Sequence, residues 1–214
     1  MIFVPTLAHE DIVVRSVRPR DARVLGRLTK DNRTWLHNWE ATIPGYSQSP
    51  PMGDVIRSVL RLARHDSAAP FVIEYRGEVV GQVTVSGLSF GSLSSGAIGY
   101  WISQEVAGRG ITPTAVALIA DWCFTGLGLH RLEICIRPEN ESSLRIVRKL
   151  GMRYEGLRRR YIHIDGDWRD HFCFAVTIDE AVGGLLARLT RGTADESLAD
   201  IPDVDRKAVK TPLR

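Results

Sequence analysis

The stretch Tyr100-Trp-Ile-Ser-Gln-Glu-Val-Ala-Gly-Arg-Gly-Ile-Thr-Pro113 joins an expected strand, residues 97–102, to an apolar helix, residues 113–124. Thr112 is a good N-cap residue and Pro113 suits a first helical turn, so the helix is expected to start here. Glycines just before a helix leave backbone N–H groups accessible, and the helix dipole adds positive charge to them. The stretch therefore predicts an anion site, although a Gly-x-Gly pair is also typical of a plain tight turn.

The rest of the chain alternates between strand and helix patterns. The expected strands share β-branched or alternating apolar residues and cover residues 11–17, 71–75, 78–88, 97–102, 130–137, 153–163 and 168–178. One expected helix begins after Pro19, and three more cover residues 54–65, 113–124 and 142–150. Arg76-Gly77 and Asp165-Gly166 are expected hairpin turns. This order predicts an α/β fold with a mixed six- to seven-stranded sheet flanked by helices.

Composition narrows the class of protein. With 214 residues and a formal net charge of +3, the chain fits one globular domain and is not singled out as a nucleic-acid binder. Cys123, Cys135 and Cys173 form no CxxC pair, which argues against a disulfide framework and a structural zinc site. We expect one domain over residues 1–186, followed by a flexible tail over residues 187–214.

The sequence predicts neither a membrane span nor a signal peptide. The most apolar run, residues 114–124, is far shorter than the roughly 20 residues of a spanning helix. Residues 1–9 lack a basic segment followed by an apolar one. A cytoplasmic protein without membrane or direct nucleic-acid partners is the expectation.

The stretch quoted above resembles the acetyl-CoA loop of the GNAT acetyltransferases, [Q/R]-x-x-G-x-[G/A]. It departs from that pattern at Ala107 and Thr112. The family binds phosphate there mostly through backbone groups, so these two side chains weaken the match without breaking it. The resemblance implies the GNAT fold and acetyl-CoA as co-substrate, without a metal. It places the pyrophosphate on Gly108, Arg109, Gly110, Ile111, Thr112 and Pro113, and the pantetheine arm along Tyr100, Trp101 and Ile102.

A second block, from Arg137 to Gly156, is similar to the second cofactor helix of the same family, N-x-x-S-x-x-[V/Y]-x-x-K-x-G-[FM]. By that resemblance Asn140 and Ser143 contact the pantetheine arm, and Arg145, Arg148 or Lys149 faces the nucleotide phosphates. The alternative without a ligand is that Asn140 only caps the helix and that the basic residues of this helix form a solvated face.

A third block, Glu155 to His171, resembles the ending of the RimJ/RimL-like ribosomal-protein acetyltransferases, and Asn32-Arg33 resembles their substrate-side segment. This implies transfer of the acetyl group of acetyl-CoA to a primary amine by direct attack in a ternary complex. The expected acceptor is the N-terminal α-amine of a ribosomal or other protein. Trp35, Trp39 and Glu40 are expected to line the acceptor groove, although the two tryptophans fit core anchors equally well.

The sequence identifies the general acid and the general base of the reaction less clearly than the cofactor residues. Many GNAT enzymes carry a tyrosine acid at the position of Val147, so the resemblance moves the acid to Ser143. The glutamate base of the RimL type aligns near Ile162 and is absent. Glu133 and Tyr161 are the substitutes we name here, beside His163, Glu40 and a water chain.

Two other functions stay open at this stage. The acceptor can be a small amine such as a polyamine, an amino sugar or an amino acid, because one fold hosts many acceptors. The chain can also be a non-catalytic CoA-binding or ribosome-associated module. The sequence leaves open whether it is a monomer or a homodimer.

Overall fold

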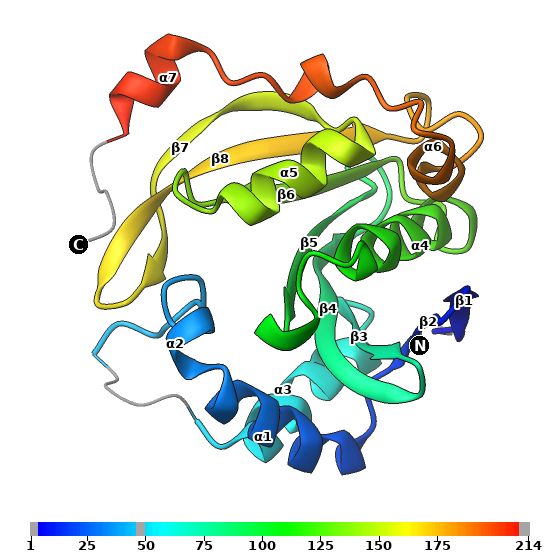
Figure 1. The fold of residues 1–214 in the computed structure, drawn as a ribbon, viewed down its shortest axis with the longest axis vertical. Coiled ribbons are helices and arrows are strands. Elements are labelled where there is room, and N and C mark those ends of the chain that lie inside the picture. The colour runs from blue at the N-terminus through cyan, green and yellow to red at the C-terminus, as the bar shows by residue number, and fades with distance from the viewer. Residues whose placement is uncertain (1–3, 46–49, 210–214) are drawn as a thin grey trace.

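The computed structural model describes residues 4–45 and 50–209, which form one sheet covered by helices on both faces (Figure 1). The strands are β1 (Leu7–His9), β2 (Ile12–Ser16), β3 (Ala68–Tyr75), β4 (Glu78–Ser89), β5 (Ser95–Ile102), β6 (Arg131–Ile136), β7 (Arg153–Ile164) and β8 (Asp167–Thr177). The α-helices are α1 (Ala22–Asp31), α2 (Arg33–Leu36), α3 (Met52–Arg64), α4 (Ile111–Thr125), α5 (Glu141–Leu150), α6 (Leu185–Arg191) and α7 (Asp203–Ala208). Short 3-10 helices cover Pro19–Asp21, Gln104–Val106 and Glu196–Ala199.

The eight strands of the described residues run in the order β1-β2-β3-β4-β5-β6-β8-β7. All neighbours are antiparallel except β5 and β6, which are parallel. The expectation of a mixed sheet is confirmed, with one strand more than expected. That strand, β1, has three residues and is too short for an alternating pattern to mark it in the sequence.

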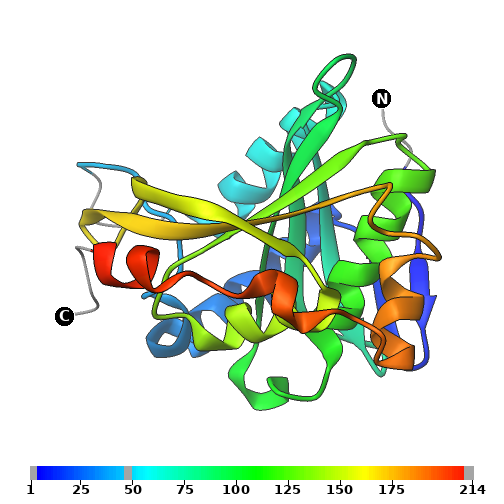
Figure 2. The ribbon, with the colours of Figure 1, turned by 90° about the horizontal axis from the view of Figure 1, so that it is seen from above.

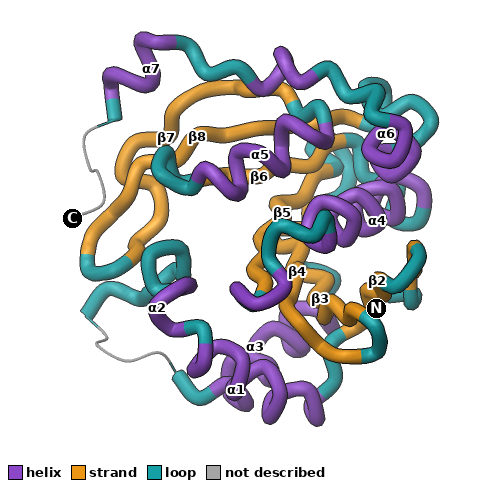
Figure 3. Tube along the Cα trace, in the orientation of Figure 1, coloured by secondary structure: helices purple, strands orange, loops and turns teal. Residues whose placement is uncertain are grey.

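The sheet lies between α4 on one face and α1 and α3 on the other (Figure 3), and a hydrophobic cluster fills each interface. Strand β3 is buried almost throughout because both its faces are covered. On one face Phe71 packs edge-on against Trp122 of α4, with 5.4 Å between ring centroids. On the other face Val72 packs with Leu25 of α1 and Ile56 of α3. Helix α4 is apolar on all sides, as expected for a helix enclosed by a core.

The sheet opens between β5 and β6. The two strands pair over only three positions, from Ser95↔Arg131 to Ala97↔Glu133. Beyond them β5 stays with β4 up to Ile102, and β6 stays with β8 up to Ile136. Figure 2 shows the β6–β8–β7 part of the sheet turned away from the β3–β5 part. The facing edges of β5 and β6 are thereby left without a neighbouring strand at this point.

Both expected hairpin turns are confirmed. Arg76 and Gly77 have φ values of 54° and 83°, and Asp165 and Gly166 have 49° and 78°. Two successive positive φ values are the mark of a type I′ turn, which matches the twist of the flanking strands.

The start of α4 differs from the sequence expectation. The N-cap is Gly110 with φ 79° and the helix begins at Ile111, so Thr112 is not the N-cap. Glycine turns the chain into the helix in the left-handed conformation, which lets the helix start two residues earlier. Pro113 lies in the first turn as expected.

The C-terminal segment also differs from the flexible tail expected for residues 187–214. Most of α6 and all of α7 lie within it, and Ala199 and Ile201 are buried in the main core. The Tyr154 hydroxyl donates to the Asp205 carboxylate over 2.8 Å. The few apolar residues that anchor the segment are too widely spaced to give a helical period. Residues 210–214 of the expected tail lie outside the described residues.

Among the described helices, α4 is apolar but has 15 residues, and none combines the length and hydropathy needed to cross a membrane.

Candidate functional site

A cavity of about 390 Å³ lies where the sheet opens, between the end of β5 and the first turns of α4 and α5. It gathers the cofactor residues named from the sequence with one exception. Its lining includes Tyr100, Trp101, Ile102, Gly108, Gly110, Ile111, Thr112, Pro113, Asn140, Ser143 and Lys149. The exception is Arg109, whose exposed side chain turns back and donates to the Glu105 carbonyl over 3.3 Å.

The wall formed by the start of α4 fits a pyrophosphate. Gly108 and Gly110 both have positive φ, at 81° and 79°, and a Cβ added to either would meet no atom within 4 Å. Both glycines line the cavity, and the N–H groups of the first helical turn beside them are free to bind a phosphate. Arg145 and Lys149 of α5 lie on the same cavity and add positive charge.

The wall formed by α5 begins with a capped helix. The Asn140 side chain accepts from the Ser143 backbone N–H over 3.1 Å and from the Ser142 hydroxyl over 2.7 Å. The capping role expected for Asn140 is confirmed, and it leaves Asn140 and Ser143 side by side on the cavity wall.

Tyr100 stands at the centre of the site. It points to the α4 side of the sheet, since it packs against the core around α4 while Trp101 packs against that of α1 and α3. Its hydroxyl is buried and has no hydrogen-bond partner among the described residues. Burial raises the pKa of Tyr100, and the nearby Ser143 hydroxyl, which misses hydrogen-bond geometry, acts in the opposite direction.

Two further cavities meet the first one at Tyr100 and Trp39, which line all three. One, of about 200 Å³, lies between the separated strands and is lined by Cys135, Arg137 and His171 among others. The other, of about 280 Å³, is lined by residues that include Glu40, Gln82, Thr84 and Ser86. The 200 Å³ cavity also shares Asn140 and Ser143 with the first cavity.

The polar wall of the third cavity was not predicted from the sequence. Gln82, Thr84 and Ser86 alternate with the buried Val83 and Val85 along β4. This period of two places the three polar side chains on one face of the sheet, and it was a usable signal.

Both tryptophans of the N-terminal segment are fixed by polar contacts. The Trp35 indole N–H donates to the Ile102 carbonyl over 3.1 Å, which ties α2 to the end of β5. The Arg137 guanidinium lies 5.7 Å from the centre of the Trp39 ring and donates to the Asn38 carbonyl over 2.7 Å. Trp35 lines the first cavity and Trp39 lines all three, and both tryptophans also anchor the segment. Their expected place in the acceptor groove stays a prediction.

The segment after α2 docks on the β7–β8 hairpin. Ala41 forms an isolated bridge with Ile164, and the Thr42 N–H donates to the His163 carbonyl over 2.8 Å. The Thr42 hydroxyl lies 2.7 Å from His163 Nδ1. His163 therefore fastens this segment to the hairpin.

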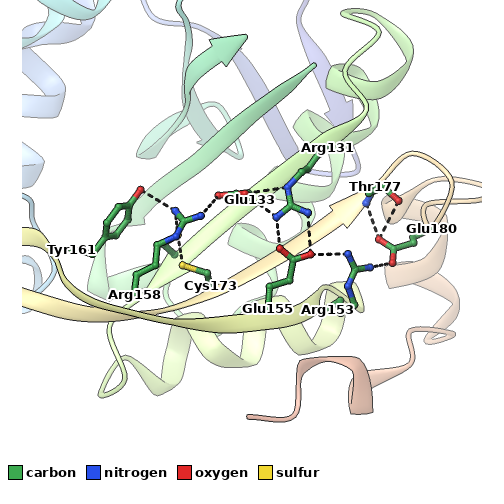
Figure 4. A network of polar contacts seen from close by, with 10 residues as sticks. Arg131, Glu133, Arg153, Glu155, Arg158, Tyr161, Cys173, Thr177 and Glu180 are labelled. Atoms are coloured by element: carbon green, nitrogen blue, oxygen red, sulfur yellow. Dashed lines mark hydrogen bonds and ion pairs between the residues drawn. The ribbon is translucent and has the colours of Figure 1, made fainter. Parts of the chain in front are cut away.

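Glu133 and Tyr161 line none of the three cavities. Both belong to the network of polar contacts in Figure 4. Arg131 and Arg158 hold the Glu133 carboxylate, at 2.8 and 2.9 Å. Arg158 also donates to the Tyr161 hydroxyl over 3.0 Å and lies over its ring. Glu133 lies at the last position where β5 and β6 still pair, before the two strands separate. Its carboxylate is therefore engaged in ion pairs outside the site.

Comparisons with known proteins agree with this geometry. The profile of the acetyltransferase (GNAT) domain matches residues 11–153. A structure of Mycobacterium smegmatis RimJ in complex with CoA-disulfide is 34% identical and has a TM-score of 0.81, covering 89% of this chain and 94% of that one. The Escherichia coli [ribosomal protein uS5]-alanine N-acetyltransferase is 29% identical over 182 residues, which are 83% of this chain and 93% of the relative. The Bacillus subtilis protein YjcK is 36% identical over 98 residues, about half of each chain (46% and 54%).

The opened sheet and the start of α4 at Gly110 are typical of an acyl-CoA acyltransferase. The chain belongs to the GNAT acetyltransferase family. Its nearly full-length relatives include that uS5-alanine N-acetyltransferase and the Mycobacterium smegmatis RimJ. The chain is accordingly an N-acetyltransferase with a CoA co-substrate.

Proposed function

We propose that the protein transfers the acetyl group of acetyl-CoA to the N-terminal α-amine of a protein, with a ribosomal protein as the acceptor. The observation that carries the proposal is the meeting of three cavities at Tyr100 and Trp39. The cavity with the phosphate-binding features can hold the CoA, while the other two open toward an acceptor chain. This arrangement supports direct attack in a ternary complex, because both reactants reach one point.

The chain positions the reactants through its backbone and its aromatic side chains. The end of β5 presents an edge that β6 does not cover, along which an extended pantetheine arm can pair. Trp35 holds that edge through the Ile102 carbonyl. Asn140 and Ser143 face the same arm from α5. Alignment of an amine on the thioester carbonyl can supply much of the acceleration.

Glu40 is the proposed attractor of the acceptor ammonium. Among the described residues that line the three cavities, it is the single carboxylate. An α-ammonium group has a pKa of about 7.7–8.0, so a nearby carboxylate and water suffice to draw it in and take up its proton. Arg33 pairs with Glu40 over 3.2 Å at the exposed rim and can release it to an incoming ammonium.

Release of CoA, measured by thiol detection, tests the proposal. The acceptors are peptides beginning with Ala or Ser from ribosomal proteins, the same peptides with blocked N-termini, and a panel of polyamines, amino sugars and amino acids. We expect turnover only with free peptide N-termini. Selective turnover of a small amine would replace the acceptor class. Acetyl-CoA binding without turnover of any amine would favour a non-catalytic CoA-binding module.

A pair of charge-removing variants separates the two glutamates. E40Q is expected to raise the KM for the peptide by about 5–20-fold, the range that one partly exposed charge contact supports. E133Q is expected to leave that KM within about twofold, because its carboxylate faces Arg131 and Arg158. Equal effects of both variants on KM contradict the assignment of Glu40.

A further inference from the structure

The Tyr100 hydroxyl is a buried polar group without a partner. Its oxygen has no hydrogen bond among the described residues, although the residue lines all three cavities. Buried hydroxyls are nearly always hydrogen-bonded, so an unpaired one calls for a specific explanation, and a catalytic role is one. For Tyr100 we look for a reaction partner at this position.

The surroundings of Tyr100 identify that partner by its chemistry. Tyr100 and Ser143 both line the cavity with the phosphate-binding features and the 200 Å³ cavity between the separated strands. In the proposed function, the acyl group changes hands where these two cavities meet. Ser143 on α5 lies beside the hydroxyl on the same cavity wall. The atom formed at that point is the thiolate sulfur of CoA, which needs a proton donor.

Apart from Ser143, which we place as the relay behind Tyr100, three other positions do not supply this proton. Val147, one turn after Ser143, is apolar and fully buried in the core. His171 lies on the 200 Å³ cavity, but its Nδ1 is 3.0 Å from the Arg169 carbonyl, and burial lowers its pKa. Tyr161 is held by Arg158 away from the cavities. Tyr100 is the acidic hydroxyl that the described part of the chain places at the junction.

We propose that Tyr100, delivered from strand β5, is the general acid that protonates the CoA thiolate. The amine nitrogen bonds to the thioester carbonyl carbon, the carbon–sulfur bond breaks, and its electron pair goes to sulfur. Tyr100 gives its proton to that sulfur and becomes a phenolate. The phenolate recovers a proton from water through the neighbouring Ser143 hydroxyl, while the proton of the acceptor amine leaves to solvent on the acceptor side.

The inference rests on the proposed acetyl transfer but can be tested apart from it. We expect Y100F to lower kcat about 100-fold, the lower range for a general acid. Calorimetry is expected to give an acetyl-CoA Kd within threefold of the native value and a Kd for free CoA raised at least fivefold. Free CoA carries the thiol that the hydroxyl contacts, whereas acetyl-CoA does not present it.

A matched control removes a hydroxyl elsewhere in the sheet. Tyr75 ends β3, lies on none of the three cavities and stacks with Arg76. Y75F is expected to leave kcat and both Kd values unchanged.

Two results would overturn the proposal. One is a kcat of Y100F within threefold of the native value. The other is an equal weakening of acetyl-CoA and CoA binding together with a lower Tm, as a purely structural tyrosine predicts. If the native protein turns over no amine, the proposed function fails, and the ratio of the two Kd values in Y100F still decides the role of Tyr100.

Discussion

Replacement of Gly110 by Ala separates the conformational role of this glycine from its role toward a ligand. Gly110 has φ 79°, and a Cβ there would meet no protein atom within 4 Å. The folded protein therefore loses only the cost of a left-handed residue with a side chain, about 1–2 kcal/mol. For a chain of this size that lowers Tm by about 2–4 °C per kcal/mol.

The same methyl group occupies the space where a phosphate must approach the backbone N–H groups of α4. Loss of one charge-assisted hydrogen bond costs about 1.5–3 kcal/mol, so the acetyl-CoA Kd of G110A should rise about 10–100-fold. Titration calorimetry measures the Kd, and thermal unfolding of the free protein measures the stability.

Gly128 provides the matched control at the other end of the same helix. It has φ 67°, and its added Cβ would also meet no atom within 4 Å. G128A should lose the same stability as G110A and keep its acetyl-CoA Kd within twofold. If G110A and G128A bind acetyl-CoA equally well, the start of α4 is a plain turn and the assignment of the phosphate site is wrong.

Two further predictions follow from perturbed ionisable groups. The hydrogen bond from Arg131, with a second one from Arg153, lowers the pKa of Glu155 to about 2, below its value in the unfolded chain. Its stabilisation is thus present above the unfolded pKa of about 4.3 and is lost as the pH falls toward 2, so E155Q should cost about 1–2 kcal/mol at pH 7 and progressively less below pH 5, as urea unfolding can measure. The Cys173 thiol, 2.9 Å away, lowers the pKa of Cys135, whereas burial raises the pKa of Cys123 to about 12. Iodoacetamide at pH 7.5 should therefore alkylate Cys135 well before Cys123, and equal rates in peptide mass spectra contradict this.

Local sequence signals predicted the helices and turns that build the site. They did not predict how these elements are arranged around the opening between β5 and β6. The apolar run of α4, the Asn140 cap and the two turns with positive φ were readable because each depends on neighbouring residues. The separation of β5 from β6 was not readable in the same way. It depends on strand pairing between segments more than 30 residues apart, which no local period encodes.

The choice among catalytic residues shows the same limit. From the sequence alone, Glu133 and Glu40 are equally plausible candidates for the base. The fold gives Glu133 two arginine partners from β6 and β7, while Glu40 lies on a cavity wall. Tyr100 was named for its backbone, and only the folded chain reveals its buried hydroxyl beside Ser143.

The site of acetylation on a peptide tests the central proposal most directly. The peptide carries a free N-terminal alanine and one internal lysine, and tandem mass spectrometry after incubation with acetyl-CoA and the protein locates the added acetyl group. We predict acetylation of the α-amine alone, lost when the N-terminus is blocked. Acetylation of the lysine side chain, or none while a polyamine in the same mixture is acetylated, contradicts the proposed function.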